Sequence, residues 1–275
     1  MPTRILPSQP MRIALAIAGS DPTGGAGLQL DLQVFRALGV HGAGVVTALT
    51  IQDTAKVHQV LPVFPSVVLN QMRRLLEDFV PDAIKIGMLG SDDVLRSVAL
   101  GLEVVEARGK ALPPIVIDPV LAASDGQPLL ERRAWDSLKN LIARATLVTP
   151  NLPEAEALTG VDASRGAGAE AAARFFVEEL GAGAALVKGG HRKGSPDDLL
   201  ARRGPGGATL EWLPGERIDA GRVHGTGCAL SSAITASLSR GDDLSSAVAR
   251  GREFVAAALR RAENVGQGAG LLVFP

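Results

Sequence analysis

The stretch Val223-His224-Gly225-Thr226-Gly227-Cys228 places a Gly-Thr-Gly turn and the only cysteine of the chain before an apolar run over residues 229–238. A helix that begins near Thr226 directs its unpaired N–H groups toward the turn, and phosphate is the natural ligand of such a helix terminus. Glycine also lets the backbone approach an anion closely. A plain loop-to-helix junction with a buried cysteine has the same pattern, so the surrounding sequence must decide between the two.

The size and charge of the chain restrict the classes of protein it can belong to. Its 275 residues suffice for one sizeable α/β domain. The 28 basic and 29 acidic residues give a formal net charge of -1, so no overall basic field attracts nucleic acid or an anionic membrane. Aromatic residues make up 3% and tyrosine is absent, which argues against base-stacking surfaces. We expect no nucleic-acid partner and no membrane partner.

The cysteine count and the N-terminus bear on location. One cysteine excludes an intrachain disulfide, and residues 1–10 lack the long apolar centre of a secretory signal. No segment combines the length and the uninterrupted apolarity of a membrane span. We therefore expect a cytoplasmic protein. Residues 1–11 are interpreted as a flexible extension and residues 12–275 as a single domain, with Met1 and Met11 both open as the start of translation.

Short aliphatic runs alternate with helical patterns along most of the chain. We expect strands buried on both faces at residues 12–18, 40–50, 83–86, 115–118, 147–149 and 184–188. Helical patterns such as residues 28–38 and 68–79 separate many of these runs. The alternation predicts an α/β fold with a mainly parallel sheet covered by helices.

The pattern changes after Gly190. Residues 199–201, 210–213 and 217–223 have the character of short strands separated by Gly/Pro turns, which predicts an antiparallel edge. Two closing helices are expected at residues 226–239 and 244–262. Ligands of such open sheets bind beyond the carboxyl ends of the strands, and nearly every polar or glycine-rich cluster of this chain follows a predicted strand.

The first of these clusters is Ala18-Gly19-Ser20-Asp21-Pro22-Thr23-Gly24-Gly25-Ala26-Gly27. Its spacing differs from the dinucleotide fingerprint Gly-x-Gly-x-x-Gly, and the chain contains no Gly-Lys-Ser/Thr of a P-loop. Small residues would let a flat ligand lie against the backbone, with Asp31 or Gln52 available to hydrogen-bond a heterocycle. The alternative is a tight turn whose aspartate caps a helix.

Two further clusters combine charge with strand ends. Thr149-Pro150-Asn151-Leu152-Pro153-Glu154 opens a helix, and Glu154 could hold Mg²⁺ directly or through water, because this ion takes few protein oxygens. Asn-x-x-Glu more often caps a helix, and Asp118 has the same two interpretations. Lys188-Gly189-Gly190-His191 ends another strand, where a buried lysine needs an anion: nucleotide phosphate or a carboxylate.

Taken together, six motifs resemble those of the hydroxymethylpyrimidine/phosphomethylpyrimidine kinases of thiamine biosynthesis, in their order and spacing over residues 12–268. The motifs are residues 18–27, Gln52-Asp53-Thr54, Lys85-Ile86-Gly87-Met88-Leu89, Pro150-Asn151-Leu152-Pro153-Glu154, Lys188-Gly189-Gly190-His191 and His224-Gly225-Thr226-Gly227-Cys228. The resemblance implies a ribokinase-like three-layer α/β/α sandwich and a homodimer. It also implies that ATP with Mg²⁺ phosphorylates 4-amino-5-hydroxymethyl-2-methylpyrimidine, and then its monophosphate, to the diphosphate.

The resemblance also assigns residues to sites. The pyrimidine pocket of the family is matched by Gly19, Ala26, Asp31, Gln52, Met88 and Val120. The metal positions are matched by Glu154 and Asp118, the nucleotide contacts by Lys188, Gly190, Thr226 and Asn151, and the anion hole by Gly225, Thr226, Gly227 and Cys228. Most relatives in the wider fold have an aspartate base at the last position. Cys228 could take the hydroxyl proton if the helix terminus lowers its thiol pKa from the usual value of about 8.5.

The chain departs from the family pattern at three places. Residues 121–126 read Leu-Ala-Ala-Ser-Asp-Gly where relatives commonly have Met-x-x-Lys/Thr-Ser-Gly, so a cation is missing and an anion is added. Arg222-Val223 replaces the usual Asn-Thr, and residues 266–275 lack the family's closing Gly-Pro and His. These changes affect the balance between the two phosphorylation steps and the nucleotide contacts.

Two other interpretations of the sequence stay open. A pyridoxal-type vitamin kinase has the same fold and a hydroxymethyl acceptor of similar size. A non-catalytic protein could use the pocket to sense a pyrimidine or its phosphates. A nicotinamide-dependent dehydrogenase is disfavoured, because the dinucleotide fingerprint is absent.

Overall fold

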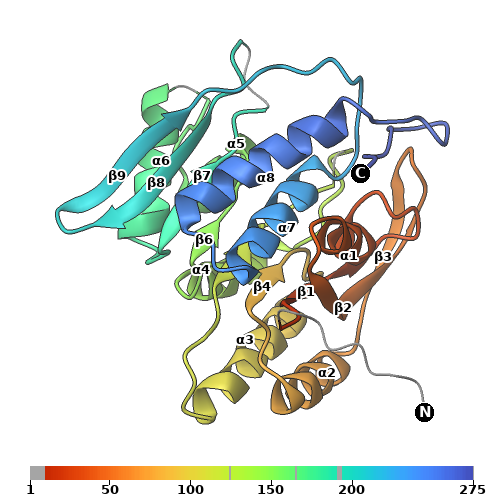
Figure 1. The fold of residues 1–275 in the computed structure, drawn as a ribbon, viewed down its shortest axis with the longest axis vertical. Coiled ribbons are helices and arrows are strands. Elements are labelled where there is room, and N and C mark those ends of the chain that lie inside the picture. The colour runs from red at the N-terminus through yellow and green to blue at the C-terminus, as the bar shows by residue number, and fades with distance from the viewer. Residues whose placement is uncertain (1–9, 124, 165, 191–193, 275) are drawn as a thin grey trace.

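A nine-stranded sheet forms the centre of the computed structural model, which describes residues 10–123, 125–164, 166–190 and 194–274. The strand order is β3-β2-β1-β4-β5-β6-β7-β8-β9 (Figure 1). The strands are β1 (Ile13–Ser20), β2 (His41–Gln52), β3 (Val57–Pro62), β4 (Ala83–Ile86), β5 (Ile115–Ile117), β6 (Leu147–Val148), β7 (Ala184–Val187), β8 (Asp198–Gly204) and β9 (Gly207–Leu213).

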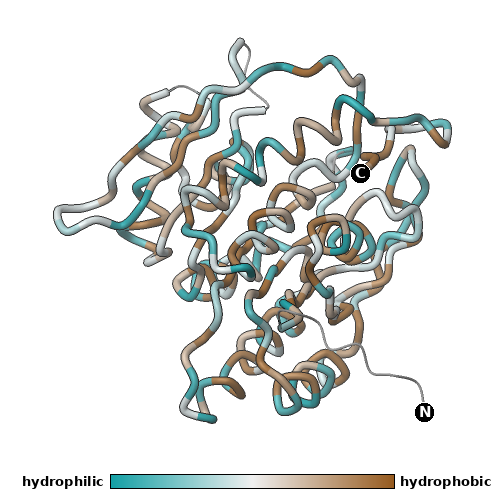
Figure 2. The backbone as a smooth tube through the Cα atoms, viewed as in Figure 1, coloured by the Kyte–Doolittle hydropathy of each residue, from teal (hydrophilic) through white to brown (hydrophobic). Residues whose placement is uncertain are grey.

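Helices cover both faces of this sheet and complete the three layers. One apolar cluster joins α2 (Pro65–Asp78), α3 (Asp92–Ala107), α4 (Trp135–Ile142), α5 (Leu152–Thr159) and α6 (Gly166–Glu178) to one face, and η1 (Arg132–Ala134) precedes α4. Two more clusters join α1 (Gly27–Ala37), α7 (Thr226–Ser239) and α8 (Leu244–Leu259) to the other face. Figure 2 shows hydrophobic stretches in both helical layers and in the strands between them.

Local sequence explains where these elements begin. The Ser91 side chain accepts a hydrogen bond from Val94 N–H and caps α3, and Asp243 caps α8 in the same way through Ser246 N–H. Pro65 occupies the first turn of α2, where its missing N–H costs nothing. In β4 every residue is buried, as expected for a central parallel strand.

The parallel core confirms the expected sheet. Strand β1 pairs in parallel with β2 and β4, and the parallel pairing continues from β4 through β5 and β6 to β7. Strands β8 and β9 form the predicted antiparallel edge. The carboxyl ends of the parallel strands therefore lie at one edge of the sheet, where the polar clusters follow them.

The structure corrects three predictions about strands. Residues 217–223 do not form a strand; only Val223 makes a bridge, to Gly270, because the chain must cross from β9 to the start of α7 (Figure 1). Strand β2 was expected to be buried on both faces but is only partly buried: it lies next to the edge strand β3, and its Leu49 and Ile51 side chains are exposed. Strand β3, which pairs antiparallel with β2, was missed.

Two predictions fall on residues outside the described ranges. These are the flexible extension, most of which lies in residues 1–9, and the contribution of His191 to the Lys188 motif. Among the described residues, none of the helices has the length and apolarity that crossing a bilayer requires.

Candidate active site

The start of α7 brings two glycine loops into contact. Gly225 caps the helix with φ 75°, a left-handed conformation that favours glycine. A Cβ at Gly225 would clash with the carbonyl oxygen of Gly25 and would lie 2.7 Å from Leu30 Cδ2. The loop after β1 is equally tight, since a Cβ at Gly27, with φ 59°, would clash with the carbonyl oxygen of Gly19. Backbone therefore packs on backbone at this edge.

The first turn of α7 is available to an anion. The amides of Thr226, Gly227 and Cys228 precede the first N–H that bonds within the helix, which is that of Ala229 to the Gly225 carbonyl. The helix dipole adds positive potential at the same place. The predicted helix 226–239 is confirmed residue for residue.

A buried ionic cluster lies directly beside this turn. Lys188 follows β7, and its Nζ is 2.8 Å from Asp118 Oδ1 and 4.0 Å from Glu154 Oε2. A Cβ at Gly227 would be 3.2 Å from Lys188 Nζ and 3.6 Å from Asp118 Oδ2. The structure thus brings together four of the predicted site residues, with the cation at the mouth of the helix turn.

The Asn151 motif is a complete capping box. Asn151 Oδ1 accepts the Glu154 N–H at 2.8 Å, and Glu154 Oε2 accepts the Asn151 N–H at 2.7 Å. The helix-capping interpretation of this motif is therefore confirmed. The same bonds fix the Glu154 carboxyl beside Lys188, so capping does not remove Glu154 from the ionic cluster.

Burial shifts the titration of this cluster. It raises the pKa of Glu154 to about 7, although the charge of Lys188 acts in the opposite direction. Burial acts to lower the pKa of Lys188, but the neighbouring Asp118 and Glu154 carboxylates outweigh it, and the pKa lies above its usual value. Lys188 is therefore a permanent cation next to a carboxyl that titrates near neutral pH.

The condition set for Cys228 as a base, a lowered thiol pKa, is not met in the protein without ligands. Burial raises the pKa of the Cys228 thiol to about 11, and the positive charge of Lys85 opposes this only in part. Asp118 and Asp31 add to the rise. The helix terminus does not overcome desolvation here, so the thiol is neutral near pH 7.

Asp31, expected in the pyrimidine pocket, lies in a closed ion pair. Lys85 Nζ is 2.7 Å from Asp31 Oδ2 and 2.9 Å from Oδ1, and both side chains are 0% exposed. Ser232 of α7 donates to Asp31 Oδ1 at 2.7 Å. Asp31 thus presents no open surface to a ligand in this structure, and Lys85, which sequence reasoning gave no role, holds it.

The other predicted pocket residues fall into two groups. A Cβ at Gly19 would be 3.0 Å from Met88 Sδ, and Val120 packs on the small apolar cluster that contains Met88. Gln52 ends β2 and lines a small hollow that His224 also lines, and Ala26 precedes α1. Gly190, the last described residue of its motif, is exposed.

Sequence reasoning missed the contact that joins the two glycine loops through side chains. His224 Nε2 lies 3.5 Å from Asp21 Oδ2, and Thr23 donates two hydrogen bonds to Asp21 Oδ1 at 2.8 Å. Burial acts to raise the pKa of Asp21, but the bonds from His224 and Thr23 outweigh it and the pKa lies below its usual value. The signal was present in the sequence, because both residues stand inside the quoted motifs.

The donors at the ionic cluster fit Mg²⁺ in kind. The described residues contain no group of three or more His, Cys, Asp or Glu arranged to hold a metal. Mg²⁺ does not need one, because it commonly uses one or two carboxylates together with phosphate and water. Asp118 and Glu154 supply two carboxylates beside the helix turn, which is the donor set expected when a nucleotide completes the coordination.

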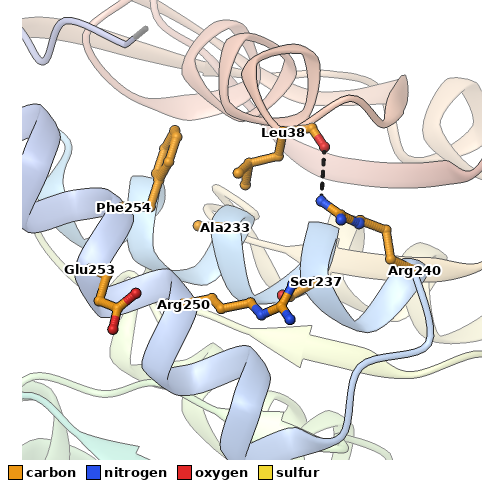
Figure 3. A pocket seen from close by; sticks show the side chains of 7 residues that line it. All are labelled: Leu38, Ala233, Ser237, Arg240, Arg250, Glu253 and Phe254. Carbon is orange, nitrogen blue, oxygen red and sulfur yellow. Dashed lines mark hydrogen bonds between the residues drawn. The ribbon is translucent and has the colours of Figure 1, made fainter.

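A larger hollow of about 350 Å³ lies elsewhere (Figure 3). It is lined by the second half of α7, the end of α1 and part of α8, and Arg240 there donates to the Leu38 carbonyl at 3.4 Å. The glycine loops and the ionic cluster lie at the beginning of α7. This hollow is therefore separate from the candidate active site.

The chain is similar to known kinases over nearly its whole length. A family model described as phosphomethylpyrimidine kinase matches residues 21–273. A hydroxymethylpyrimidine/phosphomethylpyrimidine kinase of Rhizobium meliloti is 43% identical over 263 residues, covering 94% of this chain and 95% of that protein.

Two solved structures share the fold. A phosphomethylpyrimidine kinase from Clostridium difficile has a TM-score of 0.77 and 32% identity, covering 90% of this chain and 99% of its own. An ADP complex of Bacillus subtilis pyridoxal kinase has a TM-score of 0.84 and 31% identity, covering 96% of this chain and 98% of its own.

Proposed function

This chain belongs to the phosphomethylpyrimidine kinase family, and we propose that it transfers the γ-phosphoryl group of ATP to hydroxymethylpyrimidine and then to the resulting monophosphate, for thiamine biosynthesis. In each step the acceptor oxygen bonds to the γ-phosphorus as the bond to the ADP leaving oxygen breaks. Family membership supports the reaction class. The geometry at the start of α7 supports the location of the phosphoryl transfer at this helix terminus.

One observation carries the proposal. The first turn of α7 and the buried cation meet at Gly227, where a Cβ would lie 3.2 Å from Lys188 Nζ. Phosphoryl transfer depends mainly on positioning and on neutralising charge on the equatorial oxygens of the moving group. Outward-facing amides and an ammonium group within one small volume supply that neutralisation without reorganisation.

The roles of the residues follow from this placement. The amides of Thr226, Gly227 and Cys228 hold the moving phosphoryl group, and Gly225 makes the turn possible. Lys188 balances the phosphate charge and releases part of its contact with Asp118 as it does so. Asp118 and Glu154 would hold Mg²⁺, which supplies charge neutralisation on the nucleotide phosphates when bound. Asn151 and Gly190 complete the nucleotide side.

The acceptor lies on the opposite side of the turn. We assign it to a pocket formed by Gly19, Ala26, Gln52, Met88 and Val120. Asp31 does not contact the acceptor in this assignment; its buried ion pair with Lys85 stabilises the pocket. Gln52 can hydrogen-bond the ring amine and nitrogen. Gly19 lets the ring approach the backbone beside Met88.

The raised thiol pKa restricts what Cys228 can do. A neutral thiol does not abstract a proton, so Cys228 acts first through its backbone N–H, and its side chain acts as a base only as far as bound cations lower its pKa. Both phosphorylation steps should be measured in Cys228→Ala and Cys228→Ser. Wild-type turnover in both variants would remove the side chain from the mechanism and leave only the amide.

The decisive experiment is a coupled ATP-consumption assay with hydroxymethylpyrimidine, followed by mass analysis of the product. The expected product carries two phosphoryl groups, and a single added group would restrict the function to the first step. Ligand binding without ATP consumption would instead indicate a binding protein.

Pyridoxal phosphorylation is a second candidate, because a solved pyridoxal kinase shares the fold at 31% identity. That ring also offers a hydroxymethyl group to the same site. The ratio of kcat/KM for the two alcohols separates the candidates, and we expect it to favour the pyrimidine.

The remaining organisation is proposed on the same basis. Residues 12–275 form one domain, since a single sheet carries both the nucleotide side and the acceptor side. The protein is a cytoplasmic homodimer without nucleic-acid or membrane partners. Light scattering at several protein concentrations tests the dimer.

A further inference from the structure

Two of the departures from the family pattern meet at one hollow. Asp125, in the loop after β5, and Arg222, before α7, line it together with Gln52, Lys56 and His224. They are 97 positions apart in the sequence (222 − 125) and come together only in the fold.

The backbone beneath Arg222 is fixed by the C-terminal segment Gly268-Ala269-Gly270, here called the C-terminal strap. Gly270 N–H donates to the Arg222 carbonyl at 2.8 Å, and His224 N–H donates to the Gly270 carbonyl at 2.9 Å. Ala269 N–H donates to the Thr54 carbonyl at 2.7 Å. The strap therefore ties Arg222 to the turn between β2 and β3, on the acceptor side of the site.

The guanidinium itself is free to meet a ligand. Arg222 is exposed, and within the described ranges its side chain makes no ion pair at contact distance, although its charge acts on the Asp125 carboxyl across the hollow. The nearby Asp125 has its oxygens occupied, since Oδ2 accepts the Val57 N–H and Oδ1 accepts the Gln127 N–H, both at 3.1 Å. Asp125 orders the loop through these two bonds, and the exposed Arg222 guanidinium, whose charge helps to lower the pKa of Asp125, stays accessible to an anion.

The hollow reaches the residue that precedes the phosphate turn. His224 lines it and also contacts Asp21, and the next residue is Gly225 at the mouth of the turn. The two acceptors differ in charge, because the hydroxyl group that reacts in the first step is neutral and the phosphate group that reacts in the second carries about two negative charges. Lys188 is engaged by carboxylates on the nucleotide side, and Lys85 is sealed. The monophosphate acceptor therefore requires another cation, on the acceptor side of the turn.

We propose that Arg222 is a specificity-determining residue that binds the phosphate of the monophosphate acceptor in the second phosphorylation. The proposal rests on the two-step function given above. Arginine suits this role, because its planar fork matches phosphate oxygens and is always charged.

The test measures both steps separately in the full-length protein with Arg222→Ala. Loss of a charged hydrogen bond should lower kcat/KM for the monophosphate by about 10- to 100-fold, and for the alcohol by less than about threefold. Arg222→Lys should recover part of the loss and Arg222→Gln none. Arg240→Ala, which removes a cation at the far end of α7, serves as the matched control. Titration calorimetry with the monophosphate, without ATP, should show the same loss of affinity.

Several results would overturn the assignment. Equal losses for both acceptors would indicate a structural effect, and unchanged affinity for the monophosphate would exclude the contact. A loss that follows Lys56→Ala instead would assign the phosphate to that neighbour. A wild-type protein that phosphorylates neither acceptor refutes the proposed function itself, whereas normal two-step turnover with an unaffected Arg222→Ala refutes only this inference.

Discussion

Lys85 and Lys188 are both buried lysines on or just beyond parallel strands, but their surroundings differ. Lys85, in β4, is 0% exposed and bonded to an equally sealed Asp31. The Lys188 side chain, just after β7, is 14% exposed and contacts Asp118 and Glu154 beside Gly227. For both lysines, burial acts to lower the pKa but neighbouring carboxylates outweigh it and the pKa is raised.

The comparison shows that access to solvent and ligands decides whether a buried lysine stabilises the fold or binds a ligand. A sealed pair cannot exchange its partner for a ligand, so the Lys85–Asp31 pair orients α1 against β4 and α7. A pair at the edge of a cavity can exchange, because incoming phosphate replaces the carboxylate as the anion. We therefore expect Lys188 to control rate and Lys85 to control stability.

The largest effect should come from Lys188→Met. Without the cation, charge on the moving phosphoryl group is left uncompensated, and kcat should fall by about 10²- to 10³-fold. Steady-state rates with hydroxymethylpyrimidine measure this, and urea unfolding of the same variant provides the control. If Lys188→Met loses stability but keeps the wild-type kcat, Lys188 has the structural role that we assign to Lys85, and the distinction between the two lysines is wrong.

Lys85→Met should have the opposite profile. It leaves the buried Asp31 carboxylate without its cation and with only the hydrogen bond from Ser232, which should lower the free energy of unfolding by about 3–5 kcal/mol. Urea denaturation measures the loss. If the folded fraction of this variant has reduced kcat with unchanged stability, Lys85 has a direct part in the reaction.

The double variant Asp31→Leu/Lys85→Met sharpens the same comparison. Removing both charges should restore the free energy of unfolding to within about 1–2 kcal/mol of the wild type, because no unpaired ion remains. The KM for hydroxymethylpyrimidine should then stay close to its wild-type value. A large rise in KM in the well-folded double variant would show that Asp31 contacts the substrate directly.

The smallest effect concerns the pH dependence of stability. Glu154 has a folded-state pKa of about 7, above the usual value of 4.5, so the fold favours its protonated form. Its contribution is fully present below pH 4.5 and is lost as the pH rises through 7. Between pH 5 and pH 8, without divalent cations, the wild type should lose about 1–3 kcal/mol more than Glu154→Gln. Parallel curves for the two proteins would show that the carboxyl is already ionised at pH 5.

Much of the fold could be predicted because apolar runs report burial directly. The parallel strands and α7 were found this way, as was the gathering of polar clusters at one sheet edge. Strand β3 was missed because most of its residues are exposed or half-buried, so no apolar run announces it. Residues 217–223 have a strand-like composition, but the path from β9 to α7 leaves them no partner strand.

The candidate site was harder to predict because its chemistry depends on pairing across long sequence distances. Nothing near Lys85 in the sequence indicates that Asp31 neutralises it. The titration of Cys228 depends on how deeply α7 is buried and on the charges of Lys85 and Asp118, which a helix-terminus argument omits. The spacing of the motifs was enough to find the site residues. Their charge states could be inferred only from how they pack together in the fold.

The C-terminal strap has a practical consequence for anyone who produces this enzyme. Ala269 and Leu272 are buried, and Phe274 stacks on Phe254 of α8, so the segment that follows the strap is also packed against the rest of the molecule. A purification handle fused there would pull on the segment that holds Arg222. Such fusions belong at the other terminus, and kinetic constants from proteins tagged at the tail should be compared with those of the cleaved form.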